Sequence, residues 1–233
     1  MHKTKGNVTL REAAIIAGIG LLIMVLTVPF AEFQIFPSLV DYKDPEQTAN
    51  NLQSNKSYFI LGIFLNFITI ICDILVAWAL YVFLKPVNKQ LSLLVAWFRL
   101  VYTGIYLMAL MNLLKVLALL KAENYFVATA QNQLYDQILF HFNSFGNEMG
   151  FGLILFGLYL SLLGYLTIKA SYVPKILGWL LLTAGLGYLI TYSGNFLFPS
   201  VNTDFLMITF FGELVFMIWL LIKGGRNLSP QEL

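Results

Sequence analysis

Three ionisable residues, Asp73, Arg99 and Glu213, interrupt long apolar stretches of this sequence. An ionised side chain at the centre of a bilayer costs about 2.5–3.5 kcal/mol on insertion scales, so such a residue is a functional hypothesis by default. Counted along helices, the three lie roughly 16, 12 and 14 Å from one end of their apolar stretches. This shared depth is near the middle of a hydrocarbon core of about 30 Å. We therefore predict a cluster in which the three charges contact one another.

Other polar side chains recur at helical spacing around these three charges. Separations of three, four and seven residues place side chains on the same face of a helix. We expect this face to turn inward and to form a polar pocket at the membrane midplane. The residues that share a face with one of the charges are Asn66 and Thr69 for Asp73, Tyr102, Thr103 and Tyr106 for Arg99, and Thr209 for Glu213.

The predicted cluster has two interpretations. In the first, Arg99 bridges the two carboxylates and only locks three helices together. In the second, the cluster takes part in function. Two acids and one arginine carry a net charge of −1 when all are ionised, and a net charge is unfavourable in a medium of low dielectric constant. One carboxyl group would then hold a proton, a cation or an amine. That arrangement would suit a proton relay, a coupled transporter or a ligand pocket.

A second polar group is expected nearer the outer side of the membrane. Its members either lie in the headgroup region or form the charged rim of an outer vestibule. The vestibule residues would be Glu32, Lys115, His141 and Glu148, accompanied by Asn112, Asp136 and Asn195.

The elements that must position these residues are transmembrane helices. The chain is 59% hydrophobic and 11% charged, whereas soluble domains are roughly 25% charged. Stretches of about 20 apolar residues, the length that crosses a bilayer, recur throughout. We predict an all-α polytopic membrane protein in which residues 1–233 form one six-helix domain. The expected spans are 13–36, 58–84, 91–114, 146–168, 176–198 and 204–222.

The distribution of basic residues predicts the orientation of these spans. Six is an even number, so both termini would lie on one side, and the side richer in Lys and Arg is cytoplasmic. The opposite side has Lys43, Lys56 and Lys121, with Lys115 near a span end. The basic residues of the expected cytoplasmic side are Lys3, Lys5, Arg11, Lys85, Lys89, Lys169, Lys175, Lys223 and Arg226.

Two short external helices are expected, between spans 1 and 2 and between spans 3 and 4. The first begins at Asp44-Pro45-Glu46-Gln47, which is typical of a capped helix start, and runs to about Asn55. The second is amphipathic over 126–142 and lies at the interface or extends the fourth span outward. Glycines at helical spacing predict close helix contacts in the later spans. These are Gly146 and Gly150, Gly157 and Gly164, and Gly178 and Gly185.

Several classes of function have little support in the sequence. The chain has two histidines and one cysteine, so it offers neither a three-histidine zinc site nor a cysteine-rich metal site. It contains no phosphate-binding loop, dinucleotide fingerprint or nucleophile elbow. We therefore expect no cofactor, no metal and no catalytic residue. A net charge of +2 argues against a nucleic-acid partner. The expected partners are membrane lipid, a small-molecule ligand and a second copy of the chain.

Several segments resemble bacterial membrane proteins of the DUF4386 family, and the resemblance covers about residues 11–224. It implies a six-span protein of the inner membrane and no particular activity. The segments are Asp73-Ile-Leu-Val-Ala-Trp-Ala-Leu-Tyr81, Leu84-Lys-Pro-Val-Asn88, Leu91-Ser-Leu-Leu94, Phe98-Arg-Leu-Val-Tyr102, Phe156-Gly-Leu-Tyr-Leu160, Tyr172-Val-Pro-Lys-Ile-Leu-Gly178, Gly212-Glu-Leu214 and Trp219-Leu-Leu-Ile-Lys-Gly224.

The leading functional hypothesis is that the midplane pocket binds or transports a small apolar or cationic molecule. The alternative is a structural or interaction protein without catalytic activity, in which the charges only hold helices together. An intramembrane enzyme is a third hypothesis with less support.

Overall fold

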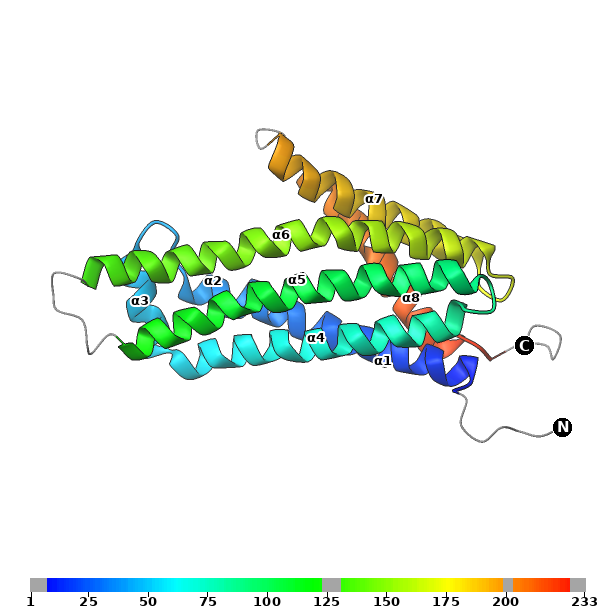
Figure 1. The fold of residues 1–233 in the computed structure, drawn as a ribbon, viewed down its shortest axis with the longest axis horizontal. Helices are drawn as coiled ribbons and strands as arrows, with labels where there is room; N and C mark the ends of the chain where they lie inside the picture. Colours follow the sequence, from blue (N-terminus) through cyan, green and yellow to red (C-terminus); the bar gives the residue numbers. More distant parts are fainter. Residues whose placement is uncertain (1–7, 123–130, 199–202, 227–233) are drawn as a thin grey trace. The chain divides into compact units, whose positions relative to one another are not determined.

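The computed structural model describes residues 8–122, 131–198 and 203–226, and every regular element in these ranges is a helix. This confirms the all-α expectation. The long helices are α1 (Leu10–Pro29), α4 (Lys56–Leu84), α5 (Lys89–Ala122), α6 (Gln131–Lys169) and α7 (Lys175–Leu197), labelled in Figure 1. The shorter ones are the π-helix η1 (Phe30–Ile35), α2 (Phe36–Leu39), α3 (Pro45–Ser54), the 3-10 helix η4 (Asp204–Phe210) and α8 (Phe211–Ile222).

Five helical stretches of the described chain are long and apolar enough to cross a membrane. They are Leu10–Leu39, Lys56–Leu84, Lys89–Lys121, Asn132–Lys169 and Lys175–Leu197. These apolar helices are compatible with a multi-pass membrane protein. The expected sixth span, 204–222, divides into η4 and the 12-residue α8. Its apolar helical part, Ile208–Ile222, is shorter than the roughly 20 α-helical residues that a bilayer requires.

The two connections that were expected to hold external helices differ from each other. In the first, α3 begins at Pro45, and the Asp44 side chain accepts a 2.9 Å hydrogen bond from the Gln47 backbone N–H, as the capping pattern predicts. In the second, residues 131–142 are the beginning of α6, so this part of the expected amphipathic helix is continuous with the long apolar helix. Residues 126–130 of this expected helix lie outside the described residues.

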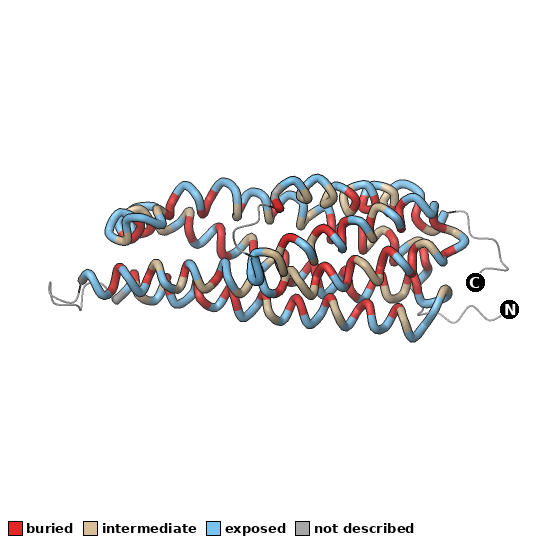
Figure 2. The backbone as a smooth tube through the Cα atoms, turned by 90° about the horizontal axis from the view of Figure 1, so that it is seen from above, coloured by how far each residue is buried: buried red, intermediate tan, exposed pale blue. Residues whose placement is uncertain are grey.

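The chain divides into two compact units. The first consists of Met1–Ile23, Cys72–Tyr102 and Leu153–Leu233, and therefore includes α7, η4 and α8. The second consists of Met24–Ile71 and Thr103–Gly152, and includes η1, α2 and α3. Because α1, α4, α5 and α6 run through the boundaries, each contributes residues to both units. Figure 2 shows buried and exposed residues alternating along these helices.

In the first unit, α6 and α7 pack through glycines. A Cβ atom at Gly164 would lie 2.5 Å from the Leu182 backbone nitrogen and 2.7 Å from the Gly178 carbonyl oxygen. A Cβ atom at Gly185 would lie 2.7 Å from the Gly157 carbonyl oxygen. These four glycines therefore make the close contact that their spacing predicts, and they make it within one chain. Gly146, by contrast, has no heavy atom within 4 Å of such a Cβ.

The first unit also joins the beginning of α1 to the end of α8. The Arg11 guanidinium donates hydrogen bonds to the carbonyl oxygens of Leu220, Leu221 and Gly224 at 3.1, 2.7 and 2.8 Å. A cation at a helix C-terminus also interacts favourably with the helix dipole. The chain then turns at Gly225, whose φ of +68° favours glycine.

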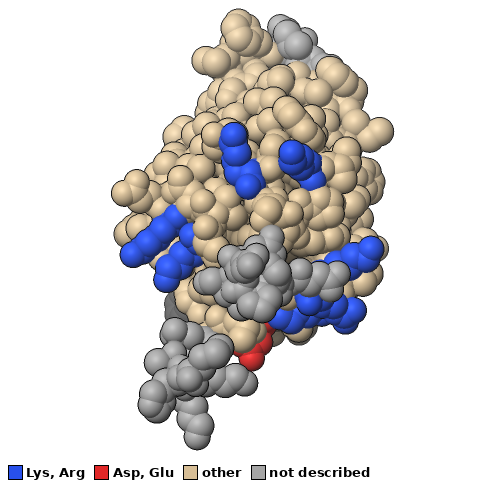
Figure 3. Space-filling view, turned by 90° about the vertical axis from the view of Figure 1, so that its right-hand side faces the viewer, with Lys and Arg blue, Asp and Glu red and all other residues tan. Residues whose placement is uncertain are grey.

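Basic side chains gather at one end of the first unit, where α1, α5 and α7 begin and α4, α6 and α8 end (Figure 3). This placement agrees with the grouping that the sequence predicts for the cytoplasmic side. The described basic residues at these helix ends are Arg11, Lys85, Lys89, Lys169, Lys175, Lys223 and Arg226.

Candidate functional site

The first unit brings Asp73, Arg99 and Glu213 together, and it adds Tyr159. Arg99 donates from Nε and Nη2 to one oxygen of Asp73, Oδ1, at 2.9 and 2.6 Å. Its Nη1 donates to the Tyr159 hydroxyl at 2.6 Å and lies 3.9 Å from the Glu213 carboxylate. The cluster thus joins α4, α5, α6 and α8, and we call these four residues the Arg99 cluster.

Aromatic rings enclose the guanidinium. The centroids of the Tyr159 and Phe156 rings lie 4.9 and 5.6 Å from Arg99 Cζ, within the range of cation–π attraction. Tyr102 packs against Phe156 at 4.9 Å between centroids. The predicted neighbour Tyr102 therefore supports the cluster through a ring contact on Phe156.

The two carboxylates of the cluster have different environments. The side chains of Asp73 and Arg99 are both fully buried, whereas the Glu213 side chain keeps 21% of its surface exposed. The second oxygen of Asp73, Oδ2, is buried and has no hydrogen-bond partner. Asp73 is therefore the fixed counterion of Arg99, and Glu213 is the carboxylate that can be reached from outside the cluster.

The sequence reasoning missed Tyr159, although a signal for it was present. Tyr159 lies nine residues before Ile168, the expected end of its span, which is roughly 14 Å along a helix. That is the depth at which Asp73, Arg99 and Glu213 were found. Because a tyrosine is much cheaper to bury than a charge, its depth alone does not mark it as part of a polar cluster.

Residues of α7 and η4 lie beside Glu213. Tyr188 is close enough to Glu213 to interact with it electrostatically, and its ring stacks on Phe210 with centroids 3.9 Å apart. Thr209 donates its hydroxyl to the Leu206 carbonyl at 2.7 Å. The same hydroxyl occupies the position that a Cβ atom at Gly187 would need. Thr209 thus helps pack η4 against α7.

The other predicted neighbours, Asn66, Thr69 and Tyr106, belong to the second unit. Tyr106 donates its hydroxyl to Asn66 Oδ1, and Asn66 Nδ2 donates to the Gly62 carbonyl at 3.0 Å. The hydroxyls of Thr69 and Thr27 lie 2.8 Å apart. The single polar face expected from helical spacing is therefore distributed between the two units.

The predicted vestibule residues form two groups in the second unit. Along α5 and α6, Lys115 donates to Asn112 Oδ1 at 3.3 Å, and His141 Nδ1 lies 3.3 Å from the same oxygen. Glu148 interacts electrostatically with His141. Glu32 lies in η1, close enough to Asn66 for the two side chains to interact. The remaining members, Asp136 and Asn195, are exposed, and Asn195 lies in the first unit.

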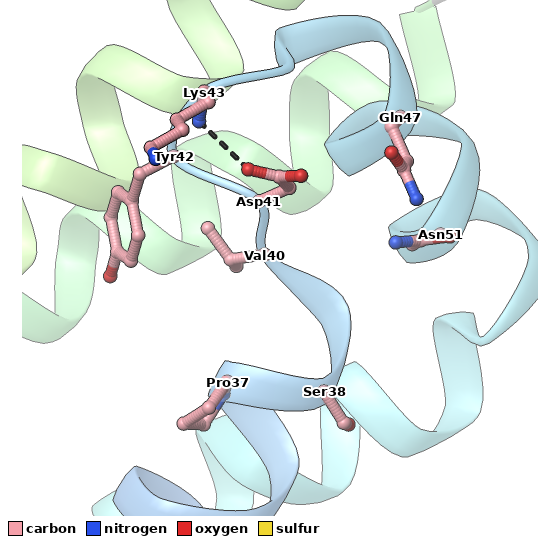
Figure 4. Close-up of a pocket in the computed structure, with 8 residues that line it drawn as sticks. All are labelled: Pro37, Ser38, Val40, Asp41, Tyr42, Lys43, Gln47 and Asn51. Atoms are coloured by element: carbon pink, nitrogen blue, oxygen red, sulfur yellow. Dashed lines mark hydrogen bonds between the residues drawn. The ribbon is translucent and has the colours of Figure 1, made fainter.

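Two adjoining pockets lie among the described residues of the second unit. One, of about 580 Å³, follows the first connection and is drawn in Figure 4, where the Lys43 backbone N–H donates to Asp41. The other, of about 300 Å³, is lined by Glu32 and by residues of α2 and α6. Tyr42 lines both pockets. Over the described ranges, no group of three or more His, Cys, Asp or Glu residues is placed to hold a metal ion.

Comparison with known proteins finds a matching family and a similar archaeal protein. Residues 16–224 match the family described as "Domain of unknown function (DUF4386)". An uncharacterised protein of the archaeon Archaeoglobus fulgidus is 38% identical over 172 residues, which cover 74% of this chain and 86% of the relative. This relative is archaeal, whereas the resemblance in the sequence was to bacterial proteins. No solved structure matches the chain.

Proposed function

Because this chain belongs to the DUF4386 family, whose description assigns no activity, we propose a function from the geometry of the Arg99 cluster. The protein binds or moves a small apolar or cationic molecule across or within the membrane, and Glu213 is the group that exchanges its partner. The observation that carries this proposal is the unequal pairing of the two carboxylates with Arg99.

When all three are ionised, the charged side chains of the Arg99 cluster carry one more negative than positive charge. Arg99 has its hydrogen bonds to Asp73 and Tyr159 at 2.6–2.9 Å, so one positive and one negative charge are already paired. Glu213 at 3.9 Å is the additional negative charge, and it is partly exposed. In a medium of low dielectric an additional carboxylate favours a proton or a cationic partner. Glu213 is therefore the exchangeable position of the cluster.

The proposal includes a six-span topology in the plasma membrane with both termini in the cytoplasm. A 3-10 helix rises about 2.0 Å per residue and an α-helix about 1.5 Å, so η4 and α8 together cover roughly 32 Å. That length matches a hydrocarbon core of about 30 Å. The basic residues that gather at one end of the first unit support the assignment of that end to the cytoplasm.

The first test uses tetraphenylphosphonium, an apolar monovalent cation, as the probe. We expect it to raise the Tm of the detergent-purified protein and to lose this effect in Glu213→Gln. Glu12→Gln is the matched control, because Glu12 is an exposed carboxylate that only caps the beginning of α1. If Glu213→Gln folds and keeps the full Tm increase, Glu213 is not the binding carboxylate.

A structural role is the second candidate, and the complete burial of the Asp73–Arg99 pair favours it. Under this alternative the cluster holds four helices together and Glu213 only adds a weak ion pair. The discriminating result would be a Glu213→Gln variant with lowered stability and a probe response identical to that of the unmodified protein.

A further inference from the structure

The pocket beside Glu32 in the second unit has the chemistry of a ligand site. Its volume of about 300 Å³ is at the lower end of the range for small-molecule pockets, roughly 300–1,000 Å³. Most of its lining is apolar and aromatic, with one carboxylate. A pocket of this kind orients a ligand through its single polar group and contacts the rest of the ligand through its walls.

The local backbone explains how Glu32 reaches this pocket. Pro29 ends α1 and has no backbone N–H to donate, and the chain continues as the π-helix η1. Short π-helical segments occur frequently at functional sites because they change the direction of side chains within a helix. One carboxylate oxygen of Glu32, Oε1, is buried and has no hydrogen-bond partner. A buried acceptor without a donor costs free energy that a ligand can recover.

The walls of the pocket are aromatic rings held in fixed positions. Phe36 meets Phe142 and Phe145 nearly at right angles, with centroids 5.4 and 5.9 Å apart. All three rings are at least 96% buried, so their positions are set by packing. Tyr42 also lines this pocket and is exposed. In Figure 4 its ring lies on the opposite side of the first connection from Gln47 and Asn51.

We propose that the Glu32 pocket binds a small organic ammonium ion. The positive nitrogen pairs with the Glu32 carboxylate, and its carbon substituents contact Phe36, Phe142 and Phe145. Aromatic faces attract cations, and this attraction is strongest for alkylammonium groups removed from water. A divalent metal ion would require several oxygen ligands, whereas Glu32 is the one carboxylate of this pocket. The proposal does not depend on Glu213.

The test compares choline with 3,3-dimethyl-1-butanol, which has the same shape and no charge. Binding to the purified full-length protein is measured by calorimetry and by the change in Tm. We expect choline to bind and the neutral alcohol to bind at least about tenfold more weakly, because it lacks the charge. Equal binding of the two compounds, or no binding of choline and of tetramethylammonium, would overturn the proposal.

Three variants locate the site. Glu32→Gln should weaken choline binding by about thirtyfold or more, and Glu46→Gln, an exposed carboxylate of α3 in the same unit, should leave it unchanged. Gly146→Leu should block the pocket, since Gly146 lines the pocket and a Cβ atom there would have no heavy atom within 4 Å, so the larger side chain has room to start. If Glu32→Gln fails to fold, Gly146→Leu still tests whether choline binds in this pocket, because unchanged binding in this variant would contradict the proposal. Loss of choline binding in Glu213→Gln alone would place the cation in the first unit and reject the Glu32 site.

Discussion

At the scale of single residues, the main feature is a fully buried arginine with one close carboxylate and one tyrosine. A buried ion pair is not by itself stabilising, because taking two charges out of water costs about as much as their attraction returns. Removing one partner is different, since the other charge is then left unpaired. The Asp73–Arg99 pair therefore gives a sharp mutational test of what the cluster contributes.

Asp73→Asn should lower the free energy of unfolding by about 3–5 kcal/mol, because Arg99 would remain buried without its counterion. The double variant Asp73→Leu/Arg99→Met should recover much of this loss. Thermal unfolding in detergent measures both. A double variant as unstable as the single one would mean that the hydrogen bonds of the pair, and not its charge balance, hold the helices.

Tyr159→Phe should cost about 1.5–3 kcal/mol, since a hydrogen bond to a charged group is lost while the ring contact remains. Tyr165→Phe is the matched control, because Tyr165 lies in the same helix and is 49% exposed. The same unfolding measurement applies. Equal, negligible effects of the two changes would show that the Tyr159 hydroxyl contributes nothing to the cluster.

At the scale of elements, helix register explains which residues meet. In the hairpin of α4 and α5, Asp73 bonds to Arg99, and Asn66 bonds to Tyr106 seven residues away on each helix. Seven residues correspond to about 10 Å along a helix. Residues on one face can therefore belong to different polar groups, which is why the predicted single face is distributed between the two units.

The glycine contact between α6 and α7 leads to a prediction at this scale. Gly164→Ala should destabilise the protein by about 1–3 kcal/mol, because its Cβ would meet backbone atoms of α7 that cannot yield. Gly104→Ala is the control, since nothing lies within 4 Å of a Cβ there and alanine favours a helix by up to about 1 kcal/mol. A stable Gly164→Ala variant would show that α6 and α7 can separate without cost.

At the scale of the whole molecule, the number of spans determines the side on which the C-terminus lies. With η4 and α8 as a sixth span, a green fluorescent protein fused after Leu233 should be fluorescent in the cytoplasm. A fusion truncated after Phe198 should instead be active with alkaline phosphatase on the outer side. Both reporters are fused at both positions. If alkaline phosphatase is active and green fluorescent protein is dark at both positions, residues 204–222 do not cross the membrane.

Arg11 shows why basic residues need the structure for their interpretation. In the sequence it counts only toward the predicted cytoplasmic side. In the first unit it also caps the C-terminal carbonyls of α8. Such a pairing between the beginning and the end of a chain has no local signal, because more than 200 residues separate the partners.

The sequence alone determined the helical class, the apolar stretches and the common depth of Asp73, Arg99 and Glu213. These properties follow from composition and from the constant rise of a helix, so they require no knowledge of how helices pack. The helices of the described chain and the ion pairs of Arg99 agree with them.

Only the tertiary structure decided which carboxylate pairs closely with Arg99, that Tyr159 joins it, and that Glu32 lies beside three phenylalanine rings. It also showed that the expected sixth span begins as the 3-10 helix η4. These facts depend on the rotation of each helix about its axis and on contacts between residues far apart in the chain. Hydropathy and spacing along one helix contain no information about either.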